Sequence, residues 1–135
     1  MTKIKNKKED LDAFNNALYQ AGDDLFKQGK YKEALAEFEK ALEAWPTDSY
    51  AVWAIGNCYS EMGKPEQAEG YFREALKNIT EEKKDDLTYN IGNALFYQKK
   101  YKEAIRLYET IPKEHRTYKM AKRNIRAAKR QIERI

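Results

Sequence analysis

The sequence has one cysteine, one histidine and three prolines among 135 residues, and these scarcities exclude several classes of protein. A lone cysteine, Cys58, cannot form an internal disulfide, so a disulfide-stapled fold is excluded and a reducing compartment is expected. A single histidine leaves no cluster of histidines and cysteines at the spacing of metal ligands. No apolar run approaches the roughly 18 residues that a membrane-spanning helix needs. We therefore expect a protein without a metal site or a membrane span.

The parts of an enzyme active site are missing as well. His115 lies in a connection that follows Pro112, and no serine or cysteine is arranged near it as a nucleophile. No glycine-rich phosphate loop is present. Carboxylates are plentiful, but they stand close to one helical turn from lysines, as Glu37 does from Lys40, which is typical of surface ion pairs. The sequence predicts a non-catalytic protein without a cofactor.

Charge is distributed unevenly along the chain. Residues 1–8 are polar and largely basic and lack the apolar core of a signal peptide, so we predict a flexible tail there and a cytoplasmic location. Residues 116–135 hold eight basic residues and one acidic residue, a charge of +7, which leaves −3 for the remainder of a chain whose total is +4. Such asymmetry predicts attraction to an acidic partner at one end, or a helix face that serves only solubility.

The dominant feature of the sequence is a unit that occurs three times. It is clearest in residues 49–82, where small and aromatic residues recur at helical spacing on both sides of a break. Its landmark residues are Gly56, Gly63, Ala68 and Phe72, and they recur 34 positions earlier as Gly22, Gly29, Ala34 and Phe38, and 36 positions later as Gly92, Lys99, Ala104 and Tyr108. A period near 34 residues with a break inside it is typical of stacked helix hairpins.

This pattern predicts an all-α solenoid with about seven helices in a single domain, residues 9–135. The repeats span about residues 15–48, 49–82 and 85–117, and a capping helix spans about 118–134. Gly29 and Pro46 end the two helices of the first repeat, and Pro65 starts the second helix of the next. Thr47 or Asp48 caps the intervening helix, and Pro112 shortens the last hairpin by about one turn.

These landmarks resemble the tetratricopeptide repeat family, whose pattern places a glycine and a tyrosine on one helix and A-x3-F on the next. The three A-x3-F elements here begin at Ala34, Ala68 and Ala104, and the last ends in tyrosine. Residues 15–135 share the likeness. Leu18, Val52 and Thr88 replace the family tryptophan. The resemblance implies a protein-interaction module whose first helices line a concave groove.

Aromatic and amide side chains are predicted to line that groove. Apolar groups gathered on a surface that the core does not use commonly mark a binding site, and an asparagine amide can both donate to and accept from a peptide backbone. Two arginines of the last helix would take acidic ligand residues. The predicted peptide-binding residues are Tyr19, Phe26, Tyr50, Trp53, Asn57, Tyr89, Asn90, Asn93, Phe96, Tyr97, Arg123 and Arg130.

Several alternatives remain open. The aromatic residues could be ordinary inter-helix packing, the module could self-associate, and the basic last helix could bind nucleic acid, the less favoured of these functions. The resemblance also suggests a clamp for the C-terminal carboxylate of heat-shock chaperones. The matching positions here are Tyr19, Asp23, Ala54, Asp86 and Asn90, and the two acidic residues among them would repel a carboxylate. We therefore do not expect that ligand.

Overall fold

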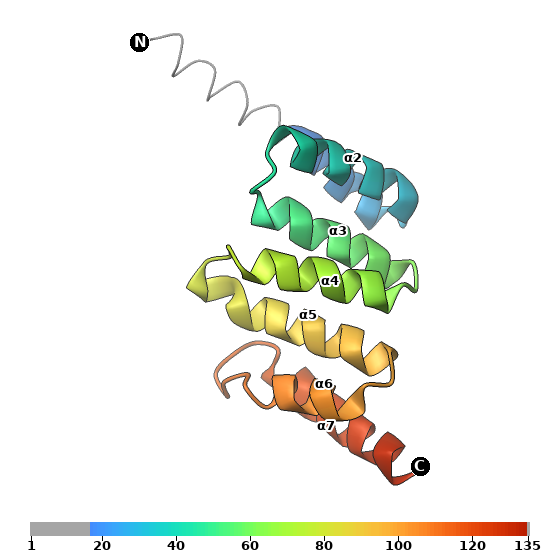
Figure 1. Cartoon of the computed structure of the whole chain (residues 1–135), viewed down its shortest axis with the longest axis vertical. Helices are drawn as coiled ribbons and strands as arrows, with labels where there is room; N and C mark the ends of the chain where they lie inside the picture. Colours follow the sequence, from blue (N-terminus) through green and yellow to red (C-terminus); the bar gives the residue numbers. More distant parts are fainter. Residues whose placement is uncertain (1–16, 135) are drawn as a thin grey trace.

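The computed structural model describes residues 17–134, and every regular element in that range is helical. Figure 1 shows the helices stacked one on the next, from residues 17–27 at one end to α7 at the other. After the helical residues 17–27 come α2 (Tyr31–Ala44), α3 (Ser49–Glu61), α4 (Pro65–Leu76), the 3-10 turn η1 (Glu81–Lys83), α5 (Lys84–Tyr97), α6 (Tyr101–Tyr108) and α7 (Tyr118–Glu133). The prediction of seven helices in an all-α solenoid is confirmed. The tail predicted at residues 1–8 lies outside the described residues.

Packing follows chain order. From α2 to α7, each α-helix packs against the one that follows it. Because these neighbours are antiparallel and joined by short turns, each hairpin can bury its apolar stripe only against the adjoining hairpins. The result is an elongated stack rather than a layered globule (Figure 1).

The helix ends lie where local chemistry places them. Of the two predicted caps for α3, Asp48 is the one used, since its carboxylate accepts hydrogen bonds from the backbone N–H groups of Tyr50 and Ala51. Pro65 occupies the first turn of α4, where its missing N–H costs nothing. The shortening that Pro112 predicts is also observed, because α6 has 8 residues whereas α2 has 14 and α4 has 12.

The extra residues between the second and third units are accommodated before α5. They form η1, which leads directly into α5, a helix of 14 residues where the corresponding α3 has 13. The longer spacing of 36 residues therefore enlarges an inter-repeat turn and leaves the hairpin itself unchanged.

All three hairpin turns have a residue in the left-handed backbone conformation at the same position. Gly29 and Gly63 have φ of 78° and 74°, and Lys99 has φ of 64° at the corresponding position. In each turn the next residue donates its N–H across the helix end, as Lys100 does to the carbonyl of Leu95 at 2.9 Å. The third turn thus has the geometry of a glycine turn, although the Cβ of Lys99 disfavours positive φ.

Replacing Lys99 with glycine is expected to raise the free energy of unfolding by about 1 kcal/mol, because glycine adopts positive φ without a Cβ clash. Urea unfolding followed by circular dichroism measures the change. The matched control is Gly63→Ala, whose Cβ would have no neighbour within 4 Å, so it should destabilise through its backbone alone. A Lys99→Gly variant less stable than the parent would contradict this account of the turn.

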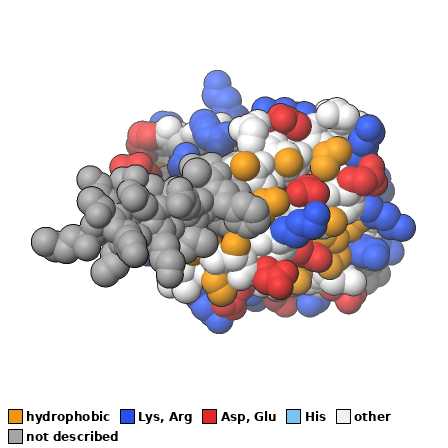
Figure 2. Space-filling view, turned by 90° about the horizontal axis from the view of Figure 1, so that it is seen from above, with side chains coloured by type: hydrophobic (Ala, Val, Ile, Leu, Met, Phe, Trp, Pro, Cys, Tyr) orange, Lys and Arg blue, Asp and Glu red, His pale blue; other side chains and the backbone are white. Residues whose placement is uncertain are grey.

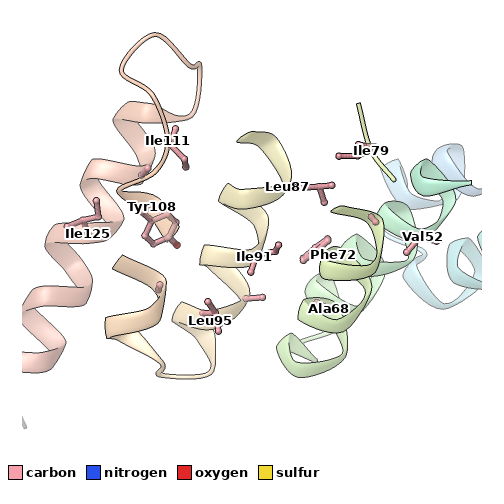
Figure 3. Close-up of a cluster of buried hydrophobic side chains, with 14 residues drawn as sticks. Val52, Ala68, Phe72, Ile79, Leu87, Ile91, Leu95, Tyr108, Ile111 and Ile125 are labelled. Carbon is pink, nitrogen blue, oxygen red and sulfur yellow. The ribbon is translucent and has the colours of Figure 1, made fainter. Parts of the chain in front are cut away.

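Within the core, aromatic rings pack onto helical glycines. Phe72 lies over Gly56, and Tyr108 lies over Gly92 in the same way. A Cβ at either glycine would stand 2.6 Å from the ring, a distance that real contacts do not reach, so only glycine lets the helices approach this closely. Figure 3 shows Phe72 from α4 and Ile91 from α5 meeting between their helices, with Tyr108 on the far side of α5.

Candidate functional site

The first helices of successive hairpins meet directly on one face of the stack. The indole Nε1 of Trp53 on α3 donates to Oδ1 of Asn90 on α5 at 2.8 Å, and Nδ2 of Asn124 on α7 donates to Oδ1 of Asn93 at 3.2 Å. These bonds join α3 to α5 and α5 to α7 without passing through α4 or α6. We call this surface the A-helix face and define it by Tyr50, Trp53, Asn57, Tyr89, Asn90, Asn93 and Tyr97.

Two aromatic rings of the A-helix face are open to solvent. Tyr50 is 43% exposed and Tyr97 is 72% exposed, the two most exposed aromatic side chains in the described part of the chain. The ring of Tyr50 stacks beside that of Trp53, with centroids 6.3 Å apart and planes inclined by 21°. Trp53 and Tyr89 are half-buried because they also pack against the core. The face therefore offers an apolar plate at Tyr50 and Trp53 and a separate ring at Tyr97.

The asparagines of this face differ in how many of their side-chain hydrogen-bonding groups lack a partner. Asn90 accepts from Trp53, which leaves its amide N–H groups available. The oxygen of Asn93 already accepts from the Tyr108 hydroxyl and from Asn124. Asn57 is half-buried, and its side chain forms no hydrogen bond with residues 17–134. Asn57 and Asn90 are thus the amides of this face with the greatest capacity for a peptide backbone.

A hydrogen-bonded network beneath the face was not predicted. The buried Tyr108 hydroxyl donates to Asn93 at 2.5 Å, and Asn124 lies within 3.4 Å of that hydroxyl. Burial raises the pKa of the Tyr108 phenol above its ordinary value, so the group stays neutral. The signal for this network was the tyrosine at a position where the other two units have phenylalanine, because the added hydroxyl requires a partner.

Three of the predicted residues lie mainly against their own hairpins. Phe26 packs edge-on to Tyr31 at 5.1 Å between ring centroids, and Phe96 packs in the same manner on Tyr101 at 5.4 Å. Tyr19 lies 5.3 Å from the ring of Phe38, and its burial raises the pKa of its phenol. All three of these predicted residues are half-buried, so they offer a ligand less surface than Tyr50 or Tyr97.

Asp86 has a structural partner rather than an open position. It is buried on α5 and forms an ion pair with Arg116 from the α6–α7 connection, while Nε2 of His115 lies 3.6 Å from the same carboxylate oxygen. The backbone N–H of Thr117 donates to Nδ1 of His115 at 3.2 Å. Asp86 therefore ties this connection to α5. Repulsion of a carboxylate ligand would then come mainly from Asp23, which itself pairs with Lys27 at 3.0 Å.

Cys58 is fully buried in the cluster that packs α2 against α3. Burial raises the pKa of its thiol from 9.0 to about 11, with a smaller contribution from the nearby Glu39 carboxylate. The thiol is neutral at physiological pH and shielded from solvent, both of which oppose reactivity. A role for this cysteine as a nucleophile has no support in the geometry.

The raised thiol pKa predicts a loss of stability in alkali. A proton is released more readily by the unfolded chain, so the contribution of Cys58 is fully present below pH 9 and is lost as the pH rises toward about 11. Urea unfolding across this range should show a decline that is shallower in a Cys58→Ala variant than in the parent. Equal slopes in the two proteins would assign the decline to the buried tyrosines instead.

Antiparallel helix pairs stacked by glycine–aromatic contacts, with one face of first helices left open, define a helical-repeat protein. The chain belongs to the tetratricopeptide repeat family: one sequence profile described as tetratricopeptide repeat matches residues 14–81, and a second matches residues 54–118. The expectation drawn from the sequence is thus confirmed. No helix within residues 17–134 has the length and apolar character to cross a membrane.

Solved structures with the same fold have low sequence identity. The first tetratricopeptide domain of Spaghetti (RPAP3) bound to the HSP90 peptide SRMEEVD superposes with a TM-score of 0.77 at 23% identity, covering 90% of this chain and 97% of that one. The second such domain of human RPAP3, in complex with the HSP70 peptide SGPTIEEVD, has a TM-score of 0.76 at 19% identity, covering 88% of this chain and 98% of that one. PilF of Pseudomonas aeruginosa has a TM-score of 0.75 at 22% identity, covering 91% of this chain and 55% of that one. At these identities the likeness shows the fold alone.

One curated relative is similar in sequence. The Protein CTR9 homolog of Arabidopsis thaliana is 31% identical over 77 residues, which are 57% of this chain. The chain spans only 7% of the length of that relative.

Proposed function

We propose that this protein is a non-catalytic interaction module that binds a peptide segment of a partner protein on its A-helix face. The observation that carries the proposal is the exposure of Tyr50 and Tyr97 on a face whose neighbouring amides retain free hydrogen-bonding groups. Exposed aromatic rings beside hydrogen-bonding amides are a common composition of binding sites, because rings supply apolar anchors and amides align a backbone.

The arrangement of the face favours a peptide over a small molecule. Tyr50 on α3 and Tyr97 at the end of α5 are supplied by different repeats, so a ligand must extend along the stack to reach both. Two domains of the same fold hold short peptides of chaperones, which supports a peptide as the ligand class. The lone, buried cysteine is consistent with a reducing compartment, and we propose the cytoplasm.

A selection from a displayed peptide library tests the proposal. Peptides retained by the protein should lose about tenfold or more in affinity for a Tyr50→Ala/Tyr97→Ala variant, since each truncation removes an exposed anchor. Both residues are exposed, so helical circular dichroism should remain that of the parent. Trp53 and Tyr89 are less suitable for this test because they also pack against the core.

The matched control alters exposed residues on the second helices, Lys32→Ala on α2 with Glu66→Ala on α4. Selected peptides should bind this control as they bind the parent. Peptides that bind the Tyr50→Ala/Tyr97→Ala variant as tightly as the parent would place the binding site elsewhere. Sedimentation distinguishes a further possibility. If the molar mass doubles as the concentration rises, and does not double in the Tyr50→Ala/Tyr97→Ala variant, the face pairs with a second copy.

A further inference from the structure

We propose that the exposed side of α7 binds an acidic segment of a partner protein, one that also carries an apolar anchor side chain. The inference deepens the proposed function, because it states the chemistry of the partner at the C-terminal end of the stack. The surface concerned, the basic face of α7, consists of the exposed residues Lys119, Lys122, Arg123, Arg126, Lys129 and Arg130.

Five basic residues elsewhere in the stack have an acidic partner three or four residues before them. Arg73 pairs with Glu69 at 2.7 Å and Lys77 with Glu74 at 2.9 Å, and Lys27, Lys40 and Lys84 have partners of the same kind. No ion pair among residues 17–134 involves an α7 side chain. The reason lies in the sequence, since Glu133 is the only acidic residue of α7 and stands at its end.

The charges of α7 also oppose the stability of the helix. Lys122, Arg126 and Arg130 follow one another at intervals of four residues, so like charges lie one above the other on the helix surface. The first turn holds no acidic residue, as in α3, whereas α2, α4, α5 and α6 each place at least one there to complement the helix dipole. These charges destabilise the isolated helix, and a mixture of acidic and basic residues would keep the surface equally soluble. An anionic partner best explains why only basic residues are present.

A hollow beside the basic face distinguishes a peptide from a nucleic acid. It has a volume of about 410 Å³ and lies between the start of α6 and the end of α7, where it is lined by Lys99, Lys100, Tyr101, Lys102, Glu103 and Ile132. Ile132 follows Lys129 by three residues, which places the hollow next to the basic face. An apolar side chain of an acidic segment can enter between Tyr101 and Ile132. The carboxylates of the segment can then contact the surrounding lysines and arginines.

The opposite end of the stack does not continue the basic surface. The face of the stack seen in Figure 2, which is the end opposite α7, shows acidic and basic side chains interspersed among apolar ones. Along the first helices, Glu61 is exposed at the end of α3, and Asp23 pairs with Lys27. A long polyanion would therefore find no continuous basic surface beyond α7, whereas an acidic segment of limited length needs none.

Fluorescence anisotropy with defined probes tests the inference. The probe is a short glutamate-rich peptide with one leucine, amidated at its C-terminus so that side chains alone supply the negative charge. Binding should weaken as salt increases, and the Lys122→Glu/Arg126→Glu variant should lose about tenfold or more in affinity. Replacing the leucine of the probe with alanine, or Ile132 of the protein with alanine, should also weaken binding severalfold.

The matched control reverses two exposed lysines of α2, Lys32→Glu and Lys40→Glu, and should bind the probe nearly as the parent does. Equal losses in both variants would show a nonspecific effect of net charge and would overturn the inference. An oligothymidine that binds more tightly than the peptide would replace it with nucleic-acid binding. If the library-selected peptides still depend on Tyr50 and Tyr97 while the acidic probe does not bind, the inference fails and the proposed function stands.

Discussion

Replacing Phe72 with alanine is expected to lower the free energy of unfolding by about 3–5 kcal/mol. The ring is 2% exposed and fills the space between α3 and α5, so its removal leaves a cavity that neither helix can close. The free energy of unfolding of a small domain is about 5–15 kcal/mol, so this change removes a large share of the stability. Urea unfolding monitored by circular dichroism measures it.

The position of Phe72 in the stack adds a second expectation. In a linear array each repeat is stabilised by its neighbours, so a cavity between the second and third hairpins should also reduce cooperativity. The unfolding transition should broaden, with near-ultraviolet and far-ultraviolet signals no longer coincident. The control is Tyr97→Ala on the exposed surface, which should change stability little. A Phe72→Ala protein as stable as this control would contradict the packing described.

Introducing a methyl group at Gly56 is expected to destabilise the protein by about 1–3 kcal/mol, although alanine is the better helix former. The new Cβ would lie 2.6 Å from one ring carbon of Phe72 and 2.7 Å from another, and the buried ring cannot move aside. Thermal unfolding or urea unfolding detects the loss.

Gly70 provides the matched comparison. It lies within α4, and a Cβ there would have no neighbour within 4 Å, so Gly70→Ala should stabilise by about 1 kcal/mol. The two substitutions are chemically identical and should have opposite signs. Combining Gly56→Ala with Phe72→Leu should recover part of the loss, since the smaller side chain relieves the contact. Destabilisation by both glycine substitutions would argue against a close approach specific to Gly56.

The architecture could be predicted because it depends on local signals repeated three times. Pro65 and Pro112 fix helix starts and ends by covalent geometry, and Gly29 and Gly63 adopt positive φ. The alternation of a small residue and an aromatic ring predicted which helices pack closely, as Gly56 and Phe72 do. Each of these rules operates within a few residues, so the sequence displays it directly.

The details of the site could not be predicted because they depend on contacts between distant residues. Asp86 was expected to repel a carboxylate ligand, but Arg116, 30 residues later, reaches it from a connection whose path no local rule determines. The bond from Trp53 to Asn90 likewise depends on how α3 and α5 are tilted against each other. Spacing placed these side chains on the correct helix, whereas their partners and exposure depended on the packing of whole hairpins.

The central claim is that the open side of the first helices holds the partner segment. A photoreactive phenylalanine analogue placed at Asn57 on α3, or at the exposed Gln67 on α4, tests it directly with a library-selected peptide. Our account predicts a covalent adduct from position 57 and none from position 67, competed by excess unlabelled peptide. An adduct formed from position 67, or equally from both positions, would contradict it.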